Sequence, residues 1–367
     1  MKLGILSTFH TRNNPTYGKS GGLFKAIIRH AQKMGATCFV FGTKDIDWKK
    51  KKILGNKFKE ESWHSSWYGF PNVIYDRSFE IIGSTETREK LSDECLFINS
   101  PDLIKLLIDK HEIYKILNKG HIRQAETQLY SSRALDYFLK NFRHIYLKPQ
   151  MGKRGEGQIS LRVRKRHFFL QFSDHENIKI IKSRKRLTQL IENHIKTYVE
   201  ERDEHFIIQE GIKISKFQNS VYDIRALMQK DLGGKWKLTG MAARVSGKGK
   251  ITSNIAKGGY VHSITKLLRK KFNKKVANCL LDQVRKNCHQ AAKLIEKKVK
   301  SAGEIAFDIL VDKTGQIFIL ELNSKPGKFV FRQMGKNLKT GERFRDTAVR
   351  RPIEYALYLA KNRQKNG

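Results

Sequence analysis

The fold of this chain is decided by the stretch Gly303 to Gly327, GEIAFDILVDKTGQIFILELNSKPG. It contains two runs rich in β-branched and aromatic residues, Ile305 to Val311 and Ile317 to Leu322. The four residues between them, Asp312 to Gly315, are turn formers that end in glycine. Two strand-forming runs on either side of such a turn predict a β-hairpin.

The predicted hairpin can gather three oxygen-bearing side chains. Side chains alternate between the two faces of a strand, so Glu321 and Asn323 share a face, and strand pairing can bring Asp308 to the same patch. Two carboxylates and an amide oxygen suit Mg²⁺, which prefers hard oxygen ligands. The alternative is a hairpin whose acidic face is merely solvated, and the rest of the chain favours the metal site.

Composition indicates a globular protein of two or three lobes. The chain has 367 residues, of which 39% are hydrophobic, which is sufficient for a core. No apolar run approaches the roughly 20 residues that span a bilayer, and no signal-peptide core follows Met1, so we expect a cytoplasmic protein. The four cysteines lack CxxC spacing, which argues against a zinc site or a disulfide framework. They are Cys38, Cys95, Cys279 and Cys288.

The chain is strongly basic. It has 73 Lys and Arg residues against 35 Asp and Glu residues, a formal net charge of +38. Such an excess attracts polyanions, which could be nucleic acid, an acidic polypeptide or anionic lipid. Composition does not choose among the three, and many of these cations can serve only to keep the surface solvated.

The first hundred residues have an α/β pattern. Leu3 to Ser7 and Thr37 to Gly42 are predicted strands, and Gly22 to Met34 has helical spacing. The loop between them contains glycines but lacks the GxGxxG spacing of a dinucleotide site. A later buried strand ends in Arg77, which could hold an anionic substrate group or form an ordinary surface ion pair.

The centre of the chain has the pattern of a lid over phosphate groups. A strand ends in Lys148, a loop with Gly152, Gly155 and Gly157 follows, and another strand comes next. Glycines let a backbone fold closely over phosphate oxygens, although a flexible hairpin turn would look similar. Upstream, Lys110 lies between the two halves of an amphipathic helix pair.

Polar residues follow on later strands. Asp223 and Arg225 share one face of a predicted strand, and Arg244 lies on the next one. Asn254 belongs to a polar loop that leads to a pair of glycines. The Asp-x-Arg pair alone could be structural.

The order of these motifs resembles the ATP-grasp superfamily, and the chain is most similar to its YheC/YheD group of spore-coat-associated proteins. The resemblance rests on the strand from Pro71 to Arg77, on Lys148-Pro149 before the lid, and on Glu321 to Gly327. It covers nearly the whole chain. The last two-thirds are also similar to the ATP-grasp ligases that add glutamate to a ribosomal protein.

The resemblance implies an α/β fold with an N-terminal pre-ATP-grasp domain, a small lid lobe and a C-terminal lobe. It also implies roles for the residues singled out above. Lys148 and Lys110 would contact ATP phosphates under the lid of Gly152, Gly155 and Gly157, Glu210 and Gly211 would lie at the adenine hinge, and Asp223 would face the ribose. Asp308, Glu321 and Asn323 would hold one or two Mg²⁺ ions. Arg225, Arg244 and Asn254 would surround the transferring phosphoryl group.

We therefore predict an ATP- and Mg²⁺-dependent carboxylate–amine ligase that works through an acylphosphate. We expect domains at residues 1–105, 106–209 and 210–367. The expected partner is a polyanion, an acidic peptide or protein, with tRNA or another nucleic acid as the competitor. The alternatives are a non-catalytic ATP-binding protein of spore-coat assembly and a nucleic-acid-associated binding protein. One departure from the family pattern is the stretch Ala125-Glu126-Thr127, where such ligases more often have a proline before the threonine.

Overall fold

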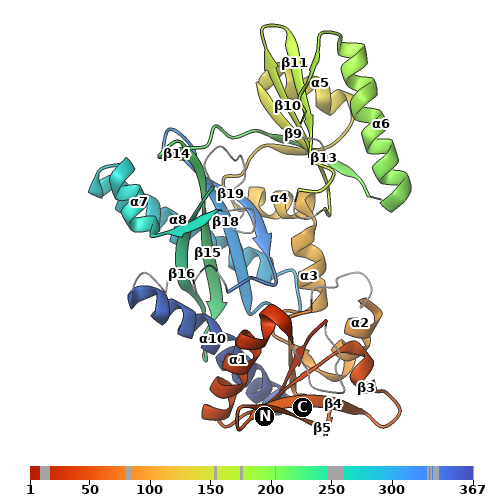
Figure 1. The fold of residues 1–367 in the computed structure, drawn as a ribbon, viewed down its shortest axis with the longest axis vertical. Helices are drawn as coiled ribbons and strands as arrows, with labels where there is room; N and C mark the ends of the chain where they lie inside the picture. Colours follow the sequence, from red (N-terminus) through yellow and green to blue (C-terminus); the bar gives the residue numbers. More distant parts are fainter. Residues whose placement is uncertain are drawn as a thin grey trace.

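The computed structural model describes residues 1–8, 17–78, 85–152, 155–173, 177–202, 204–246, 259–328, 330, 333 and 339–366. Three β-sheets with flanking helices follow one another along the longest axis of the molecule (Figure 1). The mixed α/β class expected from the sequence is confirmed. No helix among these described residues is long and apolar enough to cross a membrane.

The first sheet lies in the N-terminal part of the chain and has the strand order β3-β4-β2-β1-β6-β7, with β5 paired to β4. Its central strands β1, β2 and β6 are parallel and buried, because helices cover parallel sheets on their faces. The predicted strand–helix–strand start is confirmed. The elements are β1 (Lys2–Leu6), α1 (Gly21–Lys33), β2 (Thr37–Phe41), β3 (Ile46–Asp47), β4 (Lys52–Lys59), β5 (Ser62–Gly69), β6 (Val73–Asp76), α2 (Thr85–Glu94) and β7 (Leu96–Phe97).

The second sheet forms the lobe at the top of Figure 1, with the order β12-β11-β10-β9-β13-β8. The helices α5 and α6 pack their apolar residues on one face of this sheet. Two helices, α3 (Pro101–Ile108) and α4 (Lys110–Lys119), lead into the lobe. Its elements are β8 (Thr127–Leu129), α5 (Ser132–Asn141), β9 (His144–Pro149), β10 (Ile159–Arg164), β11 (His167–Phe172), β12 (Lys179–Ile181), α6 (Arg184–Arg202) and β13 (Phe206–Glu210).

The third sheet carries the hairpin that opened the sequence analysis. Its order is β17-β16-β15-β18-β19, with β14 paired to β15, and helices α4 and α8 pack on one face. The elements are β14 (Lys216–Phe217), β15 (Ser220–Lys230), β16 (Trp236–Val245), β17 (Tyr260–His262), α7 (Ile264–Lys271), α8 (Lys274–Glu296), β18 (Glu304–Val311) and β19 (Ile317–Asn323).

The C-terminal helix α10 (Lys339–Asn366) packs against both α1 and the third sheet. The sequence predicted only the part from Pro352 to Lys361, because proline disfavours a helix interior. Pro352 lacks the N–H that would bond to the carbonyl of Ala348 four residues earlier. Gln229 supplies the missing donor, with its Nε2 3.0 Å from that carbonyl oxygen, so the helix continues through the proline.

Candidate active site

A cavity of about 680 Å³ lies between the second and third sheets. Most of the residues singled out in the sequence line it, although the most distant of them, Lys110 and Asn323, are more than two hundred positions apart. From that set the cavity wall contains Lys110, Lys148, Gly152, Gly155, Glu210, Asp223, Arg225, Arg244, Asp308, Glu321 and Asn323.

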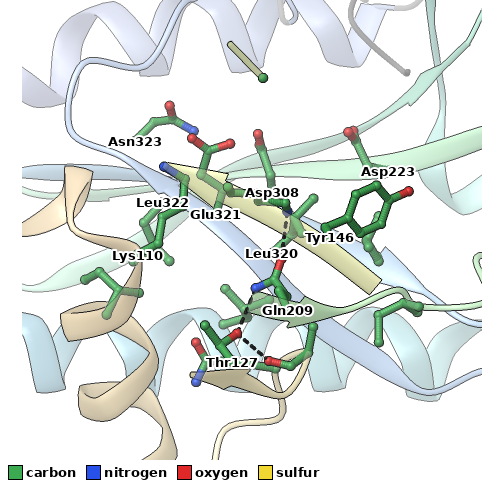
Figure 2. A pocket seen from close by; sticks show the side chains of 18 of the residues that line it. Lys110, Thr127, Tyr146, Gln209, Asp223, Asp308, Leu320, Glu321, Leu322 and Asn323 are labelled. Carbon is green, nitrogen blue, oxygen red and sulfur yellow. Dashed lines mark hydrogen bonds between the residues drawn. The ribbon is translucent and has the colours of Figure 1, made fainter. Parts of the chain in front are cut away.

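The hairpin β18–β19 brings the predicted metal ligands together. Asp308 is paired directly with Glu321, and Asn323 is paired with Ala306 two residues from Asp308. Figure 2 shows the two carboxylates and the Asn323 amide extending to the same side of the hairpin. The register then shifts, because Ile309 pairs with Ile319. Leu320 is therefore an extra residue in β19, a β-bulge of the kind that re-aims side chains beside active sites, and it lines the cavity.

Asp308 is held by two arginines. Nη2 of Arg225 and Nη2 of Arg244 each lie 2.9 Å from Asp308 Oδ2, and Arg244 also donates to both oxygens of Asp223 at 2.7 Å. Burial opposes ionisation of Asp308, but the two guanidinium groups keep the pKa of its carboxyl below the usual value. The site thus holds a carboxylate that stays charged, between two oriented cations.

Glu321 has the opposite environment. Desolvation by the surrounding protein atoms and the neighbouring Asp308 charge raise the pKa of the Glu321 carboxyl, while Lys110, Lys148 and Arg225 pull it down; the residue itself remains open to solvent. Within the described part of the chain, its side chain has no hydrogen bond or ion pair, and it faces the cavity. A carboxylate placed next to another without a partner is suited to receive a cation.

The residues fit a magnesium ion. No three His, Cys, Asp or Glu side chains group together anywhere in the described ranges, so a metal here would rely on two carboxylates and the Asn323 amide. Nδ2 of Asn323 is buried without a hydrogen-bond partner in those ranges. Few protein ligands, all with oxygen donors, match the preference of Mg²⁺, which leaves its other positions to water and phosphate.

Lys148 is the cation that faces these carboxylates across the cavity. Its ammonium donates to Gln209 Oε1 at 2.7 Å. Gln209 donates to Thr127 Oγ1 at 2.9 Å (Figure 2), and Thr127 donates to the Ala125 carbonyl at 2.9 Å. Burial and the nearby Lys110 lower the pKa of Lys148 to about 8, although Glu321 opposes the shift. A half-buried, fixed ammonium is well placed to contact phosphate.

Lys110 is used differently from Lys148. Its ammonium donates to the backbone carbonyls of Pro149, Gln150 and Gly152. The lysine therefore anchors the start of the glycine loop, as well as lining the cavity.

The predicted glycines have distinct packing constraints. A Cβ on Gly152 would lie 2.8 Å from the Pro149 side chain, and one on Gly211 would lie 2.8 Å from the His144 carbonyl oxygen. Gly155 and Gly157 have φ values of +76° and +63°, which favour glycine. Gly157 and Gly211 are outside the cavity wall, whereas Gly152 and Gly155 form part of it.

Two residues singled out in the sequence, Asn254 and Arg77, are not part of the cavity wall as the structure describes it. Asn254 lies outside the described residues. Arg77 forms no surface ion pair, since its guanidinium is buried and lies 3.4 Å from Glu304 and 3.1 Å from the Pro326 carbonyl. It therefore ties the first sheet to the chain that follows β19.

Sequence reasoning gave no site role to several residues of the cavity wall, among them Tyr146, Gln209 and Leu320. Tyr146 could have been found, because it lies two residues before Lys148 on the same strand face. Gln209 could have been found from the Gln-Glu pair that ends its strand, whereas the bulged Leu320 has no sequence signal that distinguishes it from an ordinary strand residue.

The family model described as YheC/D like ATP-grasp matches residues 99–359. The chain belongs to the YheC/D-like ATP-grasp family. It is 27% identical to the endospore coat-associated protein YheD of Bacillus subtilis (strain 168) over 92% of this chain and 74% of YheD. It is 24% identical to YheC of the same organism over 82% of this chain and 84% of YheC.

A solved structure shares the fold of the family. The D-alanine–D-alanine ligase of Bacillus anthracis, solved in complex with ATP, has a TM-score of 0.57 and 14% identity, with 100% of both chains covered. This similarity confirms the ATP-grasp fold that the order of motifs predicted.

Proposed function

We propose that this member of the family is an ATP- and Mg²⁺-dependent ligase that joins a carboxylate to an amine. The observation that carries the proposal is the convergence of Asp308, Glu321 and Asn323 opposite Lys148 in one cavity. The ligase fold supports it, as does the ATP in the Bacillus anthracis relative.

In the proposed reaction, a substrate carboxylate oxygen attacks the γ-phosphorus of ATP, and the bond to the β-phosphate oxygen breaks. The acylphosphate and ADP form. An amine then attacks the acyl carbon, and phosphate leaves as the amine loses a proton. Bound Mg²⁺, held by Asp308, Glu321 and Asn323, would neutralise charge on the phosphates.

In this reaction the two arginines and Lys148 would orient and stabilise the phosphate groups. Arg225 and Arg244 are each fixed by a carboxylate, so their guanidinium groups are oriented before the phosphoryl group arrives. Lys148 would hold a phosphate oxygen from the opposite wall. No Ser, Cys or His nucleophile is needed, because positioning and charge stabilisation suffice for phosphoryl transfer.

ADP release tests the proposal. The protein with Mg-ATP is incubated with a panel of acidic peptides, amino acids and amines. We expect ADP formation that requires both a carboxylate and an amine from the panel. YheD and YheC are endospore coat-associated proteins, which favours a second candidate, a non-catalytic ATP-binding protein of coat assembly. Such a protein would bind ATP without any substrate-dependent ADP release.

We further propose that the substrate is an acidic peptide or protein that lies along the lid sheet. Among the described residues, helices cover one face of that sheet. On the other face, a row is formed by His144, Arg162, Phe169 and Ile180, which are paired directly across β9, β10, β11 and β12. His144 lies two residues before Tyr146 of the cavity wall. Ile180 is 63% exposed, so the row offers both apolar contact and positive charge.

The electrostatics of this face favour anions. Burial, followed by the charges of Arg162 and Lys148, lowers the pKa of His144 to about 4, so the positive charge of the row comes from Arg162. Arg164 adds an exposed cation at the end of β10. By contrast, Lys185 and Arg186 belong to α6, on the covered side of the sheet.

Charge reversal at Arg162 and Arg164 is expected to weaken binding of a glutamate-rich peptide about tenfold or more at low salt, because two nearby attractions become repulsions. ATP affinity should stay within about twofold. The matched control reverses Lys185 and Arg186, which changes the net charge equally. Fluorescence anisotropy of a labelled peptide measures peptide binding by both variants. Equal losses in the two variants, or none in either, would rule out the lid row, and tighter binding of a tRNA than of the peptide would favour nucleic acid.

A further inference from the structure

Among the residues that the structure describes, the strand β5 is an unprotected sheet edge. Its eight residues, Ser62 to Gly69, pair with β4 along their whole length, and no other described strand pairs with them. Edge strands of natural proteins are usually blunted by lysine or proline, since their free N–H and C=O groups recruit other strands. This strand contains no Lys, Arg, Asp, Glu or Pro, although 29% of the chain is charged.

One tryptophan on this edge is open to solvent. Trp67 is 54% exposed, whereas Trp63 is held in place by edge-to-face contacts with Tyr17 and Phe58. The strand belongs to the first sheet, at the end of the molecule opposite the lid lobe (Figure 1). A partner on β5 would therefore leave the cavity accessible.

The side chains on one face of β5 are arranged symmetrically. Trp63, Ser65 and Trp67 share that face, paired with Phe58, Asn56 and Leu54 of β4. Consider a two-fold axis through Ser65, which relates two antiparallel copies of the strand. It places Trp63 of each copy opposite Trp67 of the other, and Ser65 opposite Ser65. Aromatic cross-strand pairs of this kind stabilise antiparallel strands.

The charge of the chain indicates which partner binds the edge strand β5. An acidic partner would be drawn to the many lysines and arginines elsewhere on the chain, because β5 itself contains no cation and the lysines paired with it, Lys52, Lys57 and Lys59, belong to the neighbouring strand β4. A second copy of a chain with net charge +38 is repelled almost everywhere, and an uncharged strand is where approach costs least. We propose that β5 pairs antiparallel with β5 of a second copy and that the protein forms a two-fold symmetric dimer.

Sedimentation velocity tests this dimer. We expect the full chain to dimerise, with the dimer fraction rising between about 0.15 M and about 0.5 M salt as repulsion is screened. Ser65→Lys places two like charges opposite each other at the axis and should give a monomer. Asn141→Lys, on the exposed end of α5, adds the same charge and should remain dimeric.

A second variant distinguishes loss of the dimer from misfolding. Trp67→Thr keeps a good strand former and should also weaken the dimer, with an unchanged circular dichroism spectrum. ATP binding should be unaffected in all variants. A parent that is monomeric at every salt concentration overturns the proposal. So does a dimer that survives both Ser65→Lys and Trp67→Thr.

Discussion

Glu321→Gln is expected to reduce substrate-dependent ADP formation by at least about 100-fold, since loss of one charge-stabilising group at a phosphoryl-transfer site costs this much or more. The change keeps the size of the side chain and removes its charge. Within the described residues, Glu321 has no hydrogen-bonding partner to lose, so the effect can be assigned to the metal patch. Steady-state kinetics at saturating ATP, with varied Mg²⁺, measures it.

Thermal unfolding of Glu321→Gln separates a loss of metal binding from a loss of stability. Desolvation and the Asp308 charge disfavour the charged form of Glu321 and raise its pKa, so a neutral amide should leave the melting temperature unchanged or higher. Asp308→Asn is the contrasting variant, because it leaves Arg225 and Arg244 without their shared carboxylate and should lower the melting temperature. Near-normal turnover by Glu321→Gln would refute the metal assignment.

Lys148→Ala is expected to weaken ATP binding about 10- to 100-fold, the range for one charge-assisted hydrogen bond in a partly buried site. The ammonium is fixed by Gln209 on the cavity wall, so the phosphate contact is pre-organised. Lys165→Ala, in the exposed turn between β10 and β11, is the control and should change ATP affinity less than twofold. Isothermal titration calorimetry compares the ATP affinities of the two variants. Equal affinities would contradict the proposed phosphate contact of Lys148.

The pH dependence of ATP binding gives an independent check on Lys148. Its pKa of about 8 means that the ammonium is charged below pH 8 and neutral above it. The parent should therefore lose about tenfold in affinity by pH 9, one unit above that pKa. Lys148→Met removes the titrating group and should show a flatter profile. A parallel decline in both proteins would assign the titration to another group.

Much of the fold followed from local patterns. The hairpin β18–β19, the first strand–helix–strand unit and the helix pair α3–α4 have strong periodicity and turn residues. Alternation along a strand also placed Glu321 and Asn323 on one face correctly, since the side-chain period of two is geometric. The roles of these residues toward ATP and metal stay predictions.

Other features depend on contacts between distant segments. No residue pattern around Leu320 predicts a bulge, because the register shift arises from pairing with β18. Likewise, α10 runs through Pro352 because Gln229, more than a hundred residues earlier, satisfies the Ala348 carbonyl. The interaction of Lys110 with the Pro149 carbonyl is of the same kind, since periodicity reveals a lysine but not its acceptors.

Transfer of labelled oxygen tests the central claim most directly. A glutamate-rich peptide with ¹⁸O in its carboxylates is incubated with the protein, Mg-ATP and an amine, and the released phosphate is analysed by mass spectrometry. If the carboxylate attacks the γ-phosphorus, each phosphate formed with ADP carries one ¹⁸O atom from the peptide. ADP formed together with unlabelled phosphate would contradict the account, because water and not the carboxylate would then have accepted the phosphoryl group.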